Sequence, residues 1–186
     1  MQLYIKNMVC SRCKMVVKDE LEKFGLHPIK IELGEVEINE ELNVDKKEEL
    51  NTVLQSFGFE IIDDKKSRLI EKIKNAIVEL IHYSEDQPKI NFSKYISENL
   101  HHDYTYLSNL FSEVEGTTIE KYFIAQRIEK VKELLKYDEL TLSQIADKLG
   151  YSSVAYLSNQ FKKETGLTPT FYKSMRQNKR KNIEIL

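Results

Sequence analysis

The chain has 186 residues, of which 41% are hydrophobic and 31% are charged, and its formal net charge at pH 7 is −2. This composition is typical of a globular protein with one large or two small domains, and it excludes a disordered chain. No apolar run approaches the roughly 20 residues that a membrane helix needs, so we expect no membrane partner. The N-terminus lacks the basic and apolar stretches of a signal peptide, which predicts a cytoplasmic protein.

Residues 1–62 alternate strand patterns with helical patterns. The strand patterns lie at 3–5, 29–33, 35–38 and 59–62. The helical patterns lie at 10–24 and 45–57, and a glycine follows each. Their predicted apolar sides are Met15, Val16, Leu21 and Phe24 in the first helix, and Leu50, Val53, Leu54 and Phe57 in the second. The predicted order is βαββαβ, an α+β domain of the ferredoxin-like class.

The only two cysteines, Cys10 and Cys13, lie between the first strand and the first helix. They are too close together to staple a fold, and in a reducing compartment such a pair is typical of ligand or redox chemistry. Two thiols three residues apart at a helix start can point the same way, and the positive helix end favours thiolates. Paired thiolates select soft ions, Cu(I) above all, whereas Zn(II) needs further ligands.

The motif from Met8 to Cys13, with the βαββαβ order, resembles the heavy-metal-associated domain of copper chaperones and metal-pumping ATPases. The resemblance covers residues 1–62 and implies a metal site at the two cysteines. The chain departs from the family pattern at Asn7, where glycine is usual, and at Phe59, where tyrosine is frequent. Two hypotheses stay open: a metal- or redox-responsive pair, and a retained fold without metal affinity.

Residues 63–88 form a predicted amphipathic linker helix. Its apolar stripe consists of Leu69, Ile70, Ile73, Ala76, Ile77, Leu80 and Ile81. We expect this stripe to pack within its own chain. The alternative is a homodimer through the helix at 66–82, because four residues of the stripe fit a heptad seam. These four are Ile70, Ile73, Ile77 and Leu80.

Residues 89–178 are predicted to be helical throughout, and they contain an internal repeat. A shift of 50 residues places Tyr106–Phe111 on Tyr156–Phe161, Gly116 on Gly166, and Tyr122 on Tyr172. Each copy has the pattern of a helix-turn-helix motif. Residues 119–136 predict a continuous connecting helix, about 27 Å long at ~1.5 Å per residue. This length is close to the ~34 Å between major-groove faces on one side of a duplex, which suits two DNA contacts in successive grooves.

The second copy offers polar residues at the start of its second helix. Leu157 and Phe161 are four residues apart and are expected to face inward. The predicted base contacts on the opposite side are Val154, Ala155, Ser158 and Asn159. Asparagine pairs with adenine through two hydrogen bonds, and small apolar groups suit a thymine methyl. Lys162 and Lys163 are predicted phosphate contacts, and the corresponding outward residues of the first copy are Thr105, Ser108 and Asn109.

Charge separates the two ends of the chain. Residues 1–62 carry eight basic and twelve acidic side chains, whereas residues 140–186 carry eight basic and three acidic ones. Phosphate binding needs cations, so double-stranded DNA is expected to bind the C-terminal part, which ends in a basic tail at 179–186. The first copy instead continues with Ser112, Glu113 and Glu115. It therefore either binds DNA weakly or contacts another protein.

The stretch from Ile145 to Tyr172, with Arg127–Leu135, resembles the two-part DNA-binding domain of AraC-type regulators over roughly residues 90–177. The resemblance implies two recognition helices in major grooves and contact of Arg127 with the DNA backbone. The sequence thus predicts an α+β domain followed by an all-α tandem helix-turn-helix domain, in a transcriptional regulator responsive to a soft metal ion or thiol redox state. An enzyme is not expected, because no nucleophile–base group or glycine phosphate loop occurs. The competing hypothesis is a metal-trafficking protein whose helical domain binds proteins.

Overall fold

The computed structural model describes residues 1–84, 91–137 and 139–181, with side chains up to residue 175. The chain forms two compact units, residues 1–76 with 96–110, and residues 77–95 with 111–186. The predicted domain boundaries at 62 and 88 stay predictions. Parts of two predicted segments lie outside the described residues, namely 85–88 of the linker and 182–186 of the basic tail.

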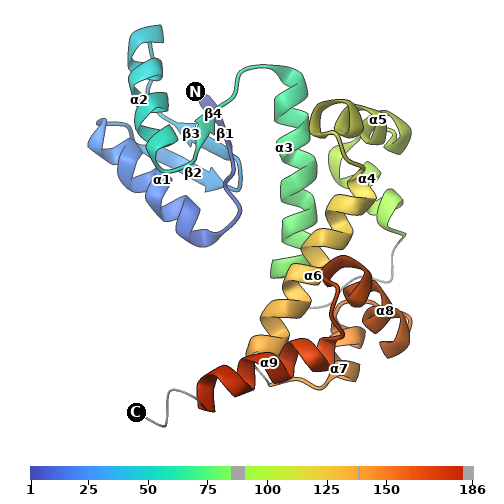
Figure 1. Cartoon of the computed structure of the whole chain (residues 1–186). Helices are drawn as coiled ribbons and strands as arrows, with labels where there is room; N and C mark the ends of the chain where they lie inside the picture. Colours follow the sequence, from blue (N-terminus) through green and yellow to red (C-terminus); the bar gives the residue numbers. More distant parts are fainter. Residues whose placement is uncertain (85–90, 138, 182–186) are drawn as a thin grey trace. The chain divides into compact units, whose positions relative to one another are not determined.

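The N-terminal part is a small α+β domain with a four-stranded antiparallel sheet (Figure 1). Its elements follow in the predicted order, β1 (Gln2–Lys6), α1 (Ser11–Lys23), β2 (Pro28–Glu32), β3 (Glu35–Ile38), α2 (Val44–Ser56) and β4 (Glu60–Ile61). The strand order in the sheet is β2-β3-β1-β4. The register pairs Leu3 with Val36, and Ile5 with Ile61.

One face of this sheet packs on α1 and α2, which contact each other. Leu3 and Ile5 of β1 alternate with polar residues and are fully buried, because successive side chains of a strand point to opposite faces. The helices contribute Val17, Leu21, Leu50 and Leu54 to the same core. Burial of this kind contributes about 25 cal/mol for each Å² of apolar surface.

Two residues of the predicted apolar sides are exposed instead. Met15 is 64% exposed and Phe57 is 50% exposed, whereas Val17 is buried. Residues two positions apart in an α-helix point in directions that differ by roughly 200° around its axis. Met15 and Val17 therefore cannot both face the sheet. Phe57 is the C-cap residue that follows the end of α2 at Ser56, and its backbone leaves the helical conformation there. The predictions for these two side chains were wrong.

The opposite face of the sheet contacts the first turns of α3 (Lys65–Val78). Tyr4 and Glu35 are register partners on that face. The Arg68 guanidinium lies 4.1 Å from the centre of the Tyr4 ring, and Lys72 Nζ lies 2.7 Å from Glu35 Oε1. The helix α3 continues into a single π-helical turn, η1 (Glu79–Tyr83).

The apolar stripe of α3 and η1 is already buried in the single chain. Leu69 is only partly buried, but every other member is at most 6% exposed, including the four residues of the heptad seam. A dimer seam needs these side chains to be free for a partner. The structure therefore confirms packing within the chain, and a homodimer through residues 66–82 stays a prediction.

Six further helices follow η1 along the described chain. They are α4 (Phe92–Leu100), α5 (Tyr104–Glu115), α6 (Ile119–Tyr137), α7 (Leu142–Lys148), α8 (Val154–Thr165) and α9 (Pro169–Lys181). The predicted connecting helix is α6, which is continuous in Figure 1 and spans about 28 Å at ~1.5 Å per residue. Among the residues that the structure describes, no helix has the length and apolar character of a membrane span.

The internal repeat is visible in the structure as well as in the sequence. The rings of Phe111 and Tyr122 lie 5.8 Å apart, and those of Phe161 and Tyr172 lie 5.5 Å apart. Gly116 and Gly166, which follow α5 and α8, both have a positive φ. Glycine adopts this left-handed conformation without steric cost, which ends both helices at equivalent places.

Candidate DNA-binding surface

The second helix-turn-helix motif consists of α7 and α8, and it shares one apolar core with α6. Leu157 and Phe161 of α8 are fully buried. They belong to a cluster with Ile128, Val131 and Leu135 of α6, Ile145 and Ala146 of α7, and Leu149 and Tyr151 of the turn. The ring of Tyr172 on α9 packs edge-on against Phe161. These contacts fix the inner face of α8 and leave its other face outward.

Local hydrogen bonds determine where the two helices begin. Thr141 and Gln144 form a capping box at the start of α7. The side chain of Ser153 accepts a hydrogen bond of 3.1 Å from the backbone N–H of Tyr156, which starts α8. Each cap of this type contributes about 1 kcal/mol. In the turn between the helices, Gly150 adopts a φ of +66°, as a tight helix-to-helix turn requires.

The outward face of α8 carries most of the predicted DNA contacts. Ala155, Asn159, Lys162 and Lys163 are exposed, and Ser158 is partly buried. Residues at positions i, i+4 and i+7 lie on one side of a helix, so the first three form one stripe. Val154 differs from the prediction, because its side chain packs partly against the core.

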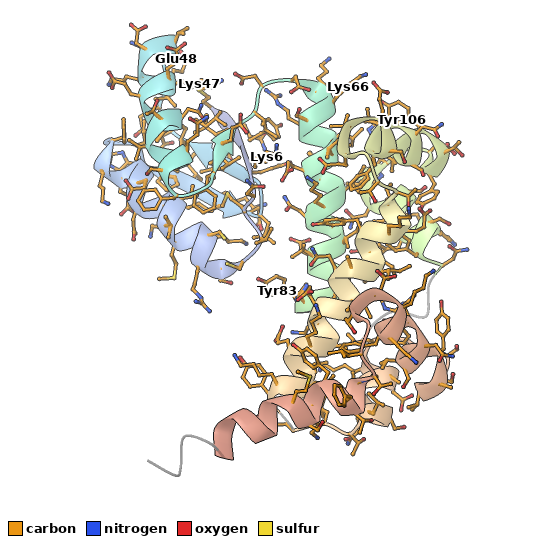
Figure 2. The ribbon with its side chains drawn as sticks, in the orientation of Figure 1. Lys6, Lys47, Glu48, Lys66, Tyr83 and Tyr106 are labelled. Atoms are coloured by element: carbon orange, nitrogen blue, oxygen red, sulfur yellow. The ribbon has the colours of Figure 1, made fainter. Side chains whose placement is uncertain are left out.

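Exposed tyrosines near the start of both recognition helices were missed by the sequence prediction. Tyr156 on α8 is 50% exposed, and Tyr106 on α5 is 51% exposed. Figure 2 labels Tyr106 on α5. The two residues coincide under the shift of 50, and each ring lies within 6 Å of another aromatic ring, Tyr151 or His102. Tyrosine hydroxyls are among the groups that bind DNA phosphates. The repeated aromatic position was the available signal, and it was assigned no role.

Arg127 is inside the second motif and does not face solvent. It is 9% exposed, and its Nη2 donates a hydrogen bond of 2.6 Å to the carbonyl oxygen of Leu149. Its guanidinium lies 3.7 Å from the centre of the Tyr151 ring. Burial lowers the pKa of Arg127, and the nearby hydroxyls of Tyr151 and Tyr156 oppose this shift. These neighbours hold Arg127 against the turn before α8, and its implied contact with the DNA backbone stays a prediction.

The first motif, α4 and α5, places its predicted residues in a similar way. Thr105 and Asn109 are exposed and Ser108 is partly buried. Asp103 starts α5, since its Oδ1 accepts hydrogen bonds from the backbone N–H groups of Thr105 and Tyr106. Contact of these residues with bases stays a prediction.

The first recognition helix lacks the two lysines that the second carries after its phenylalanine. Ser112 and Glu113 occupy the positions of Lys162 and Lys163 in the repeat, and Glu113 is exposed. Acidic groups near DNA phosphates lower affinity. The two recognition helices therefore differ in charge while they share a fold.

The cysteine pair forms a second candidate site, at the start of α1. Cys10 is the N-cap residue, and its Sγ lies 3.1 Å from the Sγ of Cys13. Burial alone would raise the pKa of both thiols. At Cys10 the hydrogen bond from Cys13 and nearby backbone N–H groups outweigh burial and lower the pKa, whereas burial and the bond to Cys10 raise the pKa of Cys13. The two sulfurs are close enough to bind one soft ion.

Ligand groups for a metal are limited around this pair. Over residues 1–84, 91–137 and 139–181, no cluster of three or more His, Cys, Asp or Glu side chains is arranged to hold a metal ion. His27, which lies in the same domain, contacts Glu40 instead. Among the described residues, the metal ligands that this site offers are therefore the thiols of Cys10 and Cys13.

Comparison with known proteins identifies the kind of domain that the helical part of the chain forms. A family model of a helix-turn-helix domain matches residues 96–175. The C-terminal domain of AraT, a response regulator from Geobacillus stearothermophilus, has 27% identity and a TM-score of 0.51, over 60% of this chain and 88% of that chain. The chain carries an AraC-type helix-turn-helix domain. The DNA-binding domain of AdpA, solved with a target DNA, shares the fold at a TM-score of 0.51 and 15% identity, over 59% of this chain and 96% of that chain.

Curated relatives of the AraC-type domain are regulators of greater length. The uncharacterized HTH-type transcriptional regulator YtdP of Bacillus subtilis is 29% identical over 162 residues, which covers 82% of this chain and 21% of that protein. The HTH-type transcriptional activator RhaR of Cronobacter sakazakii is 36% identical over 67 residues, or 36% of this chain and 24% of that protein. The chain thus spans about a fifth to a quarter of the length of these two relatives.

Proposed function

We propose that the chain is a sequence-specific DNA-binding transcription regulator that recognises its operator mainly through α8. The observation that carries this proposal is the stripe of Ala155, Asn159 and Lys162, which is exposed on a helix whose other face is fully buried. Asn159 pairs with an adenine edge, and Ala155 contacts a thymine methyl. The AraC-type domain and the regulators among the relatives support the same function.

Phosphate contacts orient α8 in the major groove. Lys162 and Lys163 lie in the last turn of α8, where their ammonium groups are exposed. Tyr156 supplies a hydroxyl near the start of the helix. Such contacts fix the register of a protein on the duplex without reading sequence. The recognition helix α5 contributes Thr105, Ser108 and Asn109, and binds more weakly because Glu113 replaces a lysine.

The N-terminal domain serves as the effector domain in this proposal. Its βαββαβ order and the strand order β2-β3-β1-β4 support a ferredoxin-like, heavy-metal-associated domain. Cys10 and Cys13 would hold a soft ion such as Cu(I), whose chemistry suits two thiolates. The pair also suits exchange with a low-molecular-weight disulfide. One thiolate attacks and releases one thiol, the other displaces the second thiol, and a Cys10–Cys13 disulfide remains.

Binding-site selection tests the proposal directly. The whole chain, reduced, is incubated with random duplex DNA, with and without Cu(I), and the bound DNA is amplified and sequenced. We expect one motif to be enriched, and its occupancy to change when Cu(I) is present. No enrichment in either arm would reject the DNA-binding function. Enrichment that Cu(I) leaves unchanged, with no metal retained on the purified protein, would reject the effector role of the cysteines.

A further inference from the structure

A buried carboxylate on α3 contacts the loop that leads to the cysteine pair. Glu71 is 6% exposed, and its Oε2 accepts a hydrogen bond of 3.2 Å from the backbone N–H of Asn7. Its Oε1 lies 3.3 Å from Nζ of Lys74. A carboxylate removed from water needs such partners, because an unpaired buried charge is costly. The Asn7 N–H is therefore one of the groups that hold the Glu71 charge in the interior.

The loop itself is fixed where it leaves β1. Asn7 has a φ of +69°, a left-handed conformation that asparagine tolerates better than most residues. Its Nδ2 donates a hydrogen bond of 2.9 Å to the carbonyl oxygen of Gly58. Met8, the next residue, is fully buried in the core of the α+β domain. Asn7 thus combines a left-handed backbone conformation with a side-chain hydrogen bond, three residues before Cys10.

One turn along α3, a second buried polar group contacts the same sheet. Asn75 is 7% exposed, and its Nδ2 donates a hydrogen bond of 2.9 Å to the carbonyl oxygen of Leu33. A Cβ at Gly34 would lie 2.4 Å from this Nδ2, so the close approach requires glycine there. Residues four apart lie on one side of a helix. Glu71 and Asn75 therefore bind two separate loops of the domain and fix the position of α3 along the sheet.

The same helix continues into the second compact unit. The helix α3 runs on to Val78 and continues as η1, which contacts α6. On η1, His82 Nε2 lies 3.1 Å from Oε1 of Gln126 on α6. The helix α6 in turn contributes Ile128, Val131 and Leu135 to the core of the second motif. Single π-helical turns such as η1 occur frequently at functional sites.

We infer that Glu71 is a positioning residue for Cys10 and Cys13, and that it transmits the state of the pair to α3. This inference rests on the proposed effector role of the cysteines. A ligand at Cys10 acts on a loop whose start is bonded to Glu71, so a displacement of that loop changes the bond to α3. The contact is charge-assisted and directional, unlike apolar packing, and it is about twice as strong as a neutral hydrogen bond.

Hydrogen exchange of the loop amides in the whole chain tests the positioning role. Glu71→Ala removes the acceptor, and we expect amide exchange at Asn7–Cys10 to accelerate about tenfold or more. Glu71→Gln keeps an uncharged acceptor, and we expect an acceleration of roughly threefold, since a neutral bond is weaker. Glu35→Gln is the matched control, because Glu35 contacts α3 through Lys72 and not through the loop. In the Glu35→Gln variant, the amides of Asn7–Cys10 should exchange as fast as they do in the unsubstituted chain.

Unchanged amide exchange in the Glu71 variants would overturn the inference. If Glu71→Ala fails to fold, the result for Glu71→Gln decides. Competition for Cu(I) with the chelator bicinchoninate gives the second measurement. Glu71→Ala should weaken Cu(I) binding about tenfold, while Glu35→Gln should leave it unchanged. If the unsubstituted chain takes no Cu(I) from the chelator, the proposed metal site is rejected. Amide exchange of the loop still tests the positioning role of Glu71 in that case.

Discussion

At the scale of single residues, partly buried polar side chains determine how the helical part responds to pH. The ring of His82 lies against α6, with Nε2 at 3.1 Å from Gln126 Oε1 and Nδ1 at 3.9 Å from Glu133 Oε2. Burial lowers the pKa of His82 below its ordinary 6.5, and nearby Lys130 acts in the same direction. The hydrogen bond to Gln126 and the nearby Glu133 and Glu129 oppose this shift.

The lowered pKa of His82 predicts a loss of stability in mild acid. As the pH falls below about 6.5, the unfolded chain takes up the proton before the folded chain does. The contribution to stability is thus complete above pH 6.5 and is lost as the pH falls through the lowered folded pKa. We expect His82→Gln to reduce the fall in Tm between pH 7.5 and 5.5. Equal falls in both proteins would show that His82 does not cause the acid sensitivity.

Arg127 yields a prediction that separates a structural role from a DNA contact. Arg127→Gln removes a buried, charged hydrogen bond to the Leu149 carbonyl, which costs about 1.5–3 kcal/mol of unfolding free energy. Because the guanidinium is covered, the salt dependence of DNA binding should stay the same. Urea unfolding and a salt series of DNA binding measure the two effects. A retained unfolding free energy with a salt slope lower by about 1 would instead support a phosphate contact.

At the scale of elements, the two recognition helices share a fold but differ in their charge. Lys162 and Lys163 follow Phe161 on α8, whereas Ser112 and Glu113 follow Phe111 on α5. Cations that contact phosphates release counterions from DNA, which makes binding dependent on salt. The salt dependence of binding should therefore arise mainly from the α8 end of the domain.

Lys162→Ala tests this asymmetry. The slope of log K against log salt concentration should fall in magnitude by about 0.9, because one phosphate contact is lost. Lys46→Ala is a suitable control, since Lys46 is exposed on α2 of the other unit. Fluorescence anisotropy at several salt concentrations measures both slopes. Equal slopes for the Lys162 variant and the control would place Lys162 outside the DNA contact.

Elements with a local sequence pattern could be predicted from the sequence. Contacts between residues far apart in the sequence could not. The connecting helix and the repeat were predicted because apolar spacing and glycines are local patterns, and the structure has them at Ile119–Tyr137 and at equivalent Phe–Tyr pairs. The sequence could not show whether Met15 or Val17 is buried against the sheet, because three apolar residues follow one another there. The burial of Arg127 depends on Leu149 and Tyr151, which are more than 20 residues away.

At the scale of the whole molecule, α3 belongs to both compact units. Its first turns contact the sheet, and its last turn and η1 belong with α6. The predicted linker rested on the amphipathic pattern of this helix. Its polar side, with Glu71 and Asn75, carried no local sign of burial. The helix thus contributes residues to each compact unit.

Recognition of a DNA sequence by α8 is tested by the specificity ratio of Asn159→Ala. The ratio is the Kd for a shuffled duplex divided by the Kd for the selected operator, at one fixed salt concentration. Loss of a paired contact with adenine should lower this ratio about tenfold, at 1–3 kcal/mol for such a contact. Asn109→Ala, the equivalent change on α5, should lower it less. An unchanged ratio for Asn159→Ala would contradict sequence recognition by α8.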